Sequence, residues 1–253
     1  ASPRRTDPTD GETYKSVLKP IGQTYTNRTL DTDKGEVSEV TIEGASQEEV
    51  DHTVKVMGGE DWERWMDFLR DADVLAEGCK TTAYTYIGKE LTWPIYGQAT
   101  IGKAKEDLDR AAAAIIGKNS DLLVQANVSS LKALVTQASS AIPVMPLYIS
   151  LIYKVMKEEG THEGCIEQIY GLFTQCLFGN TPTLDEANRY RMDGKETNDA
   201  TQAKIKALWD QVTQENFHDL SDYKGYNHEF LKLFGFDISS VDYDSEVDPM
   251  VNW

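Results

Sequence analysis

The feature that most constrains the fold is a strand–helix–strand succession between residues 81 and 129. "TTAYTYI" (81–87) is rich in β-branched and aromatic residues, which favours a strand. Apolar residues then recur at helical spacing after Ala99, and "DLLVQANVS" (121–129) is again typical of a strand. Two strands joined by a helix predict a βαβ unit and a parallel sheet, so we expect an α/β fold.

The helix within this unit carries a lysine on its apolar side. Residues three and four apart share a helix face, and one such stripe contains Ile101, Lys105, Leu108, Ala112 and Ile115. Lys103 instead shares its face with charged residues. Lysine is almost never fully buried unless it is paired. Lys105 therefore either extends its ammonium to the edge of the stripe or holds a ligand there.

The segments around this unit predict flanking elements. Residues 1–44 indicate an extended loop region with a short hairpin around "TDKGEV". Ser46 and Glu49 have the spacing of a capping box at a helix start. Beyond it, a stripe at helical spacing predicts core contacts for Trp62, Trp65, Met66 and Leu69. After Pro146 the pattern is mostly helical.

Residues 133–153 contain no charged side chain and are long enough to span a bilayer. Several hydroxyl and amide side chains make the stretch semi-polar, and Pro143 and Pro146 interrupt it. We interpret it as a loop leading into a buried helix, with a transmembrane span as the alternative.

Charge and motifs exclude several classes of function. A net charge of −17 argues against nucleic-acid binding, although residues 1–30 carry five basic against three acidic side chains. The three cysteines form no C-x-x-C and the four histidines no H-E-x-x-H, so neither a disulfide framework nor a metal site is predicted. No two glycines are separated by a single residue, so the G-x-G-x-x-G dinucleotide fingerprint is absent.

Tyr96 lies nine residues before Lys105, between Pro94 and Gly97, and is expected on the loop before the helix. An ordinary phenol has a pKa of about 10, and a nearby ammonium lowers it. A tyrosine–lysine pair can therefore act as an acid and oxyanion stabiliser near neutral pH. On spacing alone, a core tyrosine beside a lysine that reaches solvent is the simpler interpretation.

Four segments together resemble one family. They are "VKVMGGEDWERW" (54–65), "AYTYIGKELTWPIYGQATIGKAKEDLDRAA" (83–112), "AIPVMPLY" (141–148) and "KVMKEEGTHEGCIEQI" (154–169). The chain thereby resembles the trans-2-enoyl-CoA reductases and the related long-form enoyl-acyl-carrier-protein reductases, over most of residues 1–243. The family signature is a tyrosine and a lysine separated by eight residues, here Tyr96 and Lys105.

The resemblance implies a Rossmann-like, doubly wound parallel sheet of the short-chain-dehydrogenase kind. Residues 1–253 would form the C-terminal, catalytic and substrate-binding portion of one such domain, with extra helices over the substrate. It further implies that NADH reduces trans-2-enoyl-CoA in fatty-acid synthesis. Tyr96 would hydrogen-bond or protonate the enolate oxygen. Lys105 would hold the nicotinamide ribose and keep the pKa of Tyr96 low.

Further roles are carried over from the family by position. Tyr86 matches a substrate-contacting tyrosine, and Tyr153 stands where the acyl pocket commonly has phenylalanine. Leu134, Val135 and Thr136 match a cofactor-contacting turn, and Ala1 falls in the "SLASP" segment near the dinucleotide.

The sequence departs from the family by beginning inside "SLASP". The preceding family segment, with the first strands and the glycine-rich pyrophosphate loop, is the expected partner, in the same or a separate chain. The chain is then a fragment, one half of a split enzyme, or a non-catalytic structural subunit. The acyl-carrier-protein reductase remains an alternative, as does either a mitochondrial or a cytoplasmic location.

Overall fold

A parallel three-stranded sheet forms the centre of the computed structural model, which describes residues 3–248 and residue 250. The strand order is β5–β6–β7, with β5 at Lys80–Thr85, β6 at Gln125–Ser130 and β7 at Tyr190–Arg191. Helix α3, Thr100–Lys118, connects β5 to β6. This confirms the predicted βαβ unit. The second strand begins later than predicted because residues 120–122 form a 3₁₀ turn, η2 (Ser120–Leu122).

Two helices pack along α3 and complete a small core. They are α1, Gln47–Met57, which begins with the predicted Ser46–Glu49 capping box, and α2, Glu60–Asp71. Met66 of α2 packs with Leu108 and Ile115 of α3. Trp65, however, is 59% exposed, so the prediction that it is core was wrong. It lies one position from Met66 and therefore about 100° around the helix, on the side that faces away from α3.

The first 44 residues are more ordered than expected. They form two antiparallel hairpins, β1 (Arg4–Thr6) with β2 (Thr13–Lys15) and β3 (Tyr25–Asp31) with β4 (Glu36–Ile42). The second hairpin turns at the predicted "TDKG" segment, where Gly35 has a φ of 68°. Positive φ favours glycine, so the turn is locally encoded.

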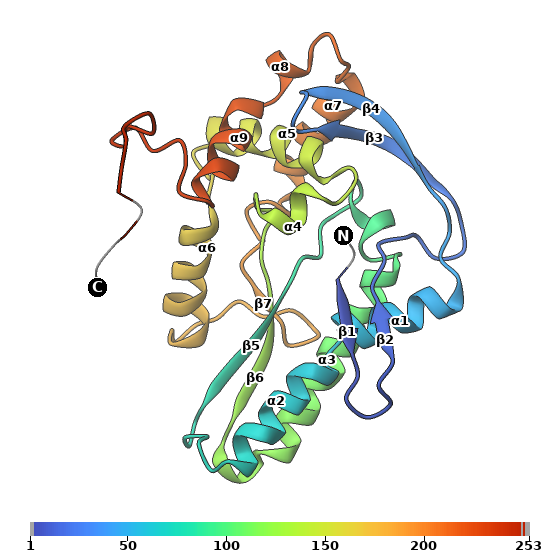
Figure 1. Cartoon of the computed structure of the whole chain (residues 1–253), viewed down its shortest axis with the longest axis vertical. Coiled ribbons are helices and arrows are strands. Elements are labelled where there is room, and N and C mark those ends of the chain that lie inside the picture. The colour runs from blue at the N-terminus through green and yellow to red at the C-terminus, as the bar shows by residue number, and fades with distance from the viewer. Residues whose placement is uncertain (1–2, 249, 251–253) are drawn as a thin grey trace.

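The rest of the chain is mainly helical, as predicted after Pro146. The elements are η1 (Trp93–Ile95), α4 (Gln137–Ser140), α5 (Met145–Glu158), α6 (Cys165–Gly171), a π-helical η3 (Leu172–Leu177), α7 (Asp199–Gln211), α8 (Phe217–Leu220) and α9 (Tyr223–Lys232). Figure 1 shows α2 and α3 on one side of β5 and β6 and α6 on the other, while α5, α7, α8 and α9 gather near the β3–β4 hairpin.

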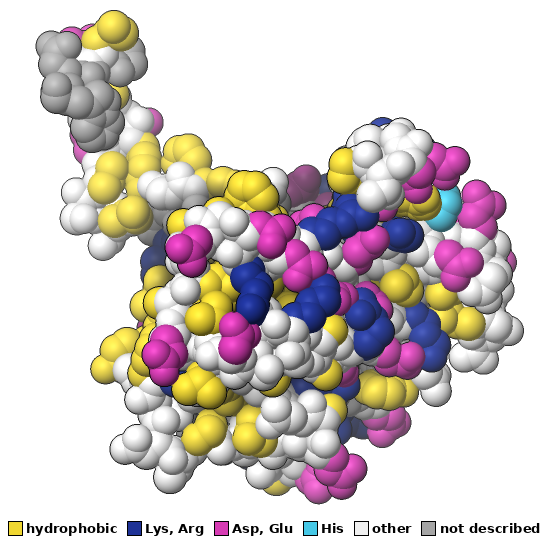
Figure 2. Space-filling model, turned by 90° about the horizontal axis from the view of Figure 1, so that it is seen from below, with side chains coloured by type: hydrophobic (Ala, Val, Ile, Leu, Met, Phe, Trp, Pro, Cys, Tyr) yellow, Lys and Arg dark blue, Asp and Glu magenta, His cyan; other side chains and the backbone are white. Residues whose placement is uncertain are grey.

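The uncharged stretch 133–153 contains a loop, interrupted by the short helix α4, and then most of α5, whose side chains are largely buried in the main core. Among the described residues, no helix combines the length and apolarity that a membrane crossing needs. On the face shown in Figure 2, basic and acidic side chains lie among one another rather than in separate fields.

Candidate active site

The carboxyl ends of the three parallel strands meet at one edge of the sheet, where ligands commonly bind in such folds. Tyr86 follows β5, Ala133 lies shortly after β6, and Glu196 lies shortly after β7. A pocket of about 180 Å³ opens here. It is lined by Thr85, Tyr86, Ile87, Trp93, Tyr96, Gly97, Ile101, Gly102, Lys105, Glu106, Val128 and Arg189. Its size is below the roughly 300 Å³ of typical ligand pockets, so it fits a ring or a short acyl group.

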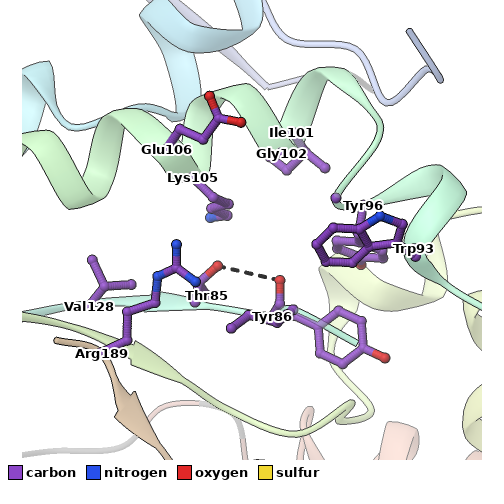
Figure 3. Close-up of a pocket in the computed structure, with 12 residues that line it drawn as sticks. Thr85, Tyr86, Trp93, Tyr96, Ile101, Gly102, Lys105, Glu106, Val128 and Arg189 are labelled. Atoms are coloured by element: carbon purple, nitrogen blue, oxygen red, sulfur yellow. Dashed lines mark hydrogen bonds between the residues drawn. The ribbon is translucent and has the colours of Figure 1, made fainter. Parts of the chain in front are cut away.

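Lys105 projects from α3 into this pocket, toward Thr85 and Arg189 (Figure 3). Burial lowers the pKa of its ammonium to about 8. Within the described residues the ammonium has neither a hydrogen bond nor an ion pair. Lys103, on the next face of the same helix, pairs with Glu106 at 2.9 Å. The lysine on the apolar stripe is therefore the one left free to bind a ligand.

Tyr96 directly follows η1 and is only 8% exposed. Its ring packs edge-to-face on Tyr86, with 4.8 Å between ring centroids. Burial first, and then the charge of Glu196, raises the pKa of Tyr96 above its ordinary range. Lys105 is not among the groups that shift this pKa, so its predicted role in lowering the pKa of Tyr96 stays a prediction. Tyr96 is a neutral phenol and hence a hydrogen-bond donor.

Tyr86 presents its ring to the pocket rather than its hydroxyl. The hydroxyl is directed away from Lys105 (Figure 3) and donates to Glu196 Oε1 at 2.8 Å. It also lies 3.2 Å from Thr92 Oγ1. The substrate contact of Tyr86 stays a prediction, and with its hydroxyl bound to Glu196 that contact would be made by the ring.

The structure adds two residues that sequence reasoning missed. Arg189 lines the pocket, and its guanidinium is held by Asp109, with 2.9 Å between Nε and Oδ1. Glu196 accepts the hydrogen bond of the Tyr86 hydroxyl. Neither carries a local signal, because Arg189 lies in a short loop and Glu196 in the polar segment "DGKETND". Among the described residues, no three His, Cys, Asp or Glu side chains converge as metal ligands.

The other predicted site residues lie outside the pocket lining. Thr136 caps α4 through Ser139, and the Val135 carbonyl accepts from Cys165 Sγ at 3.6 Å. Leu134 precedes them in the same turn after β6. Their cofactor role stays a prediction.

Tyr153 is buried on α5, where its ring packs on His162 at 4.4 Å, and its acyl-pocket role stays a prediction. Ala1 lies outside the described residues. The structure thus brings together Tyr86, Tyr96 and Lys105 of the predicted set.

Comparison with protein families gives two matches. A model described as the trans-2-enoyl-CoA reductase catalytic region matches residues 1–178. A model described as the enoyl reductase FAD binding domain matches residues 184–247.

Curated relatives named enoyl-[acyl-carrier-protein] reductase [NADH] align with the whole chain. The protein of Pseudoalteromonas atlantica is 74% identical and that of Idiomarina loihiensis 69% identical, each over 253 residues. The chain spans about 64% of the length of these relatives. The organisms are bacteria, so these relatives lend no support to the mitochondrial alternative.

Solved structures named trans-2-enoyl-CoA reductase share the fold. One from Treponema denticola, in complex with NAD, is 49% identical with a TM-score of 0.91, over 98% of this chain and 62% of that one. One from Clostridium, in complex with NADH, is 43% identical with a TM-score of 0.94, over 98% of this chain and 63% of that one. The Rossmann-like α/β prediction is confirmed. The chain belongs to the trans-2-enoyl-CoA reductase family, whose catalytic-region model covers residues 1–178.

Proposed function

We propose that this chain supplies the substrate-binding and proton-donating part of an NADH-dependent reductase of trans-2-enoyl thioesters. The observation that carries the proposal is the pocket at the carboxyl edge of the sheet, which holds Tyr96 as a neutral donor and Lys105 as a cation with no partner among the described residues. Two solved structures with the same fold are named as complexes with NADH or NAD, which supports this cofactor.

Tyr96 is the residue that acts on the substrate oxygen. NADH, when bound, supplies a hydride and its two electrons to the β-carbon of the conjugated double bond. Negative charge then develops on the thioester oxygen. Tyr96 donates a hydrogen bond, and the balancing proton, at that oxygen, and tautomerisation places the proton on the α-carbon. Removing one donor of this kind commonly lowers kcat by roughly 100- to 1000-fold.

Lys105 fits the nicotinamide end of the cofactor. An ammonium offers three hydrogen-bond donors. Those of Lys105 have no acceptor among the described residues, so ribose hydroxyls can serve as the acceptors. The pyrophosphate end is different, because the sequence has no glycine-rich loop that could hold it. The chain therefore matches half of a dinucleotide site.

The stretch matched by the FAD model does not fit a flavin pyrophosphate. Its cations are largely committed to carboxylates, as with Arg189 and Asp109, Arg191 and Asp193 at 2.7 Å, or Lys204 and Glu159 at 2.7 Å. We therefore assign no chemical step to a flavin. The visible absorbance of the denatured, filtered protein tests for one directly.

The carrier of the acyl group is either coenzyme A or an acyl carrier protein. The family resemblance favours coenzyme A, and the acidic charge of the chain suits an acidic carrier protein poorly. The curated relatives, which are the more identical, are named for the carrier protein. Comparing kcat/KM for crotonyl-CoA and for the crotonyl carrier protein decides between the two.

The first test mixes the chain with NADH and crotonyl-CoA and follows the loss of reduced-nicotinamide absorbance. It is run with the 253-residue chain alone and with the part of the curated relatives outside the matched region added. Turnover in either case supports the reductase. Its absence in both favours a non-catalytic structural subunit instead.

The second test compares two substitutions under the conditions that give turnover. Tyr96→Phe removes the donor at the thioester oxygen and is expected to lower kcat by at least about 100-fold. Lys103→Ala is the matched control, because Lys103 does not line the pocket and, among the described residues, its ammonium pairs with Glu106 alone, so its rate should stay close to that of the parent. Retained turnover in Tyr96→Phe contradicts the proposed role.

A further inference from the structure

Glu196 is a fully buried carboxylate that the proposed chemistry does not use. Its exposed fraction is 0%, yet it belongs to a polar loop after β7. A buried carboxylate is costly unless it is hydrogen-bonded, so its partners show what it organises.

The two oxygens of Glu196 serve two different parts of the site. Oε1 accepts from the hydroxyls of Tyr86 and Tyr148, each at 2.8 Å. Oε2 accepts from the backbone N–H of Ala133 at 2.5 Å. One carboxylate thus connects Tyr86, whose ring packs on Tyr96, with Ala133, the first residue of the 133–136 turn.

Lys132 holds the same turn from the other side. It is 3% exposed, and its Nζ donates to the Ala133 carbonyl at 2.7 Å. Both backbone polar groups of Ala133 are therefore bound by buried charged side chains. Gln202 supports the arrangement by donating to the Tyr148 hydroxyl at 3.0 Å and to the Glu196 carbonyl at 2.8 Å.

We propose that Glu196 is a positioning residue that fixes the distance between the 133–136 turn and the Tyr86–Tyr96 wall. This rests on the proposed function, in which the wall contacts the substrate, and on the cofactor contact that the family resemblance predicts for the turn. Through its two oxygens, Glu196 sets how closely hydride donor and acceptor approach. Misplacement of about 1 Å by a residue away from the chemistry can lower a rate by roughly 100-fold.

The kinetic test uses Glu196→Gln in the protein that turns over. The amide has one acceptor oxygen where the carboxylate has two, so the hydrogen bonds at one of the two ends are lost or reversed. We expect kcat to fall by roughly 100-fold. We also expect the isotope effect with NADH deuterated at the transferred position to rise, because hydride transfer becomes rate-limiting. An unchanged isotope effect overturns the proposal.

Asp193→Asn is the matched control. Asp193 is equally buried in the same loop and accepts from Ser130 Oγ at 2.9 Å and from Arg191 Nε at 2.7 Å. It has no hydrogen bond to Tyr86 or Ala133. Its substitution should lower the melting temperature without moving the isotope effect. An equal rise in both variants would mean that the effect is general destabilisation, and would overturn the proposal.

Two further variants and a second readout separate this proposal from the proposed function. Tyr86→Phe removes one of the two hydrogen bonds to Oε1, keeps the bond to Oε2, and should raise the isotope effect while leaving the Ala133 amide protected. Glu196→Ala, which removes both acceptor oxygens, should speed hydrogen exchange of that amide, whether or not the protein reduces enoyl thioesters. Unchanged exchange in Glu196→Ala overturns the positioning role even if the reductase activity is confirmed.

Discussion

Lys105 places a cation in a largely apolar environment that offers no acceptor within the described part of the chain, and this arrangement destabilises the folded protein. A structural lysine at the edge of a helix stripe would stabilise its surroundings through its methylene groups. A lysine that serves ligand binding instead lowers the stability of the folded protein as long as no ligand is bound. The two interpretations of the stripe 101–115 therefore predict opposite changes in stability when the charge of Lys105 is removed.

Lys105→Met is expected to stabilise the fold and abolish turnover. Burial lowers the folded-state pKa from 10.5 to about 8, so the unfolded chain holds this proton more tightly between those values. The penalty is full below pH 8 and disappears as pH rises toward 10.5. At pH 7 the gain is at most about 3 kcal/mol, since one pKa unit corresponds to about 1.4 kcal/mol.

Denaturant unfolding of the parent and of Lys105→Met across this pH range measures that gain. The difference in unfolding free energy should shrink steadily above pH 8. A variant less stable than the parent at pH 7 would identify Lys105 as a packing residue.

At the scale of elements, the site depends on how closely η1 and the start of α3 approach. A Cβ on Gly102 would lie 2.6 Å from the Tyr96 carbonyl oxygen and closer still to that of Gly97. Both are backbone atoms, so any side chain at position 102 must push the Tyr96 segment away from α3. The glycine is therefore required by the contact that sets Tyr96 beside Lys105.

Gly102→Ala is expected to lower both stability and turnover. Overpacking of this kind typically costs about 1–3 kcal/mol, and the displaced Tyr96 should lower kcat. Gly117→Ala on the same helix is the control, because a Cβ there meets nothing within 4 Å. It should stabilise the protein by about 0.5–1 kcal/mol through helix propensity alone. Thermal unfolding and the turnover assay test both variants, and equal effects would refute the steric argument.

At the scale of the whole molecule, the sheet has an open edge. The order β5–β6–β7 leaves β5 without a neighbour on its outer side among the described residues. Parallel sheets are ordinarily covered on both faces and extended by further strands. The chain spans about 64% of its curated relatives, so we expect the remaining part to complete this edge.

Hydrogen exchange of residues 80–85 tests this expectation. In the chain alone, the outward amides of β5 should exchange quickly, while those of β6 are protected between two neighbours. Adding the remaining part of a curated relative should protect β5 and increase the affinity for NADH. If the amides of β5 still exchange quickly after the addition, the added part binds elsewhere on the molecule.

Local sequence was sufficient for most of the elements and for the helix face on which Lys105 lies, whereas its pairing with Tyr96 came from the family resemblance. Helical periodicity placed Lys105 on the inner side of α3 and Lys103 on the outer side. The "TDKG" turn and the Ser46 cap were also read correctly, since each depends on a few adjacent residues. Helical periodicity did not show which face of α2 packs against another element, and the core position predicted for Trp65 was wrong for that reason.

The sequence by itself determined the α/β fold class, the βαβ unit and which lysine of α3 lies on its inner side, because short-range spacing decides helix faces and strand alternation. Only the tertiary structure decided that Tyr86 turns its hydroxyl to Glu196, 110 residues away, and that the pKa of Tyr96 rises rather than falls. Such contacts arise where the ends of parallel strands meet. Desolvation there depends on everything packed around a group, which no local pattern records.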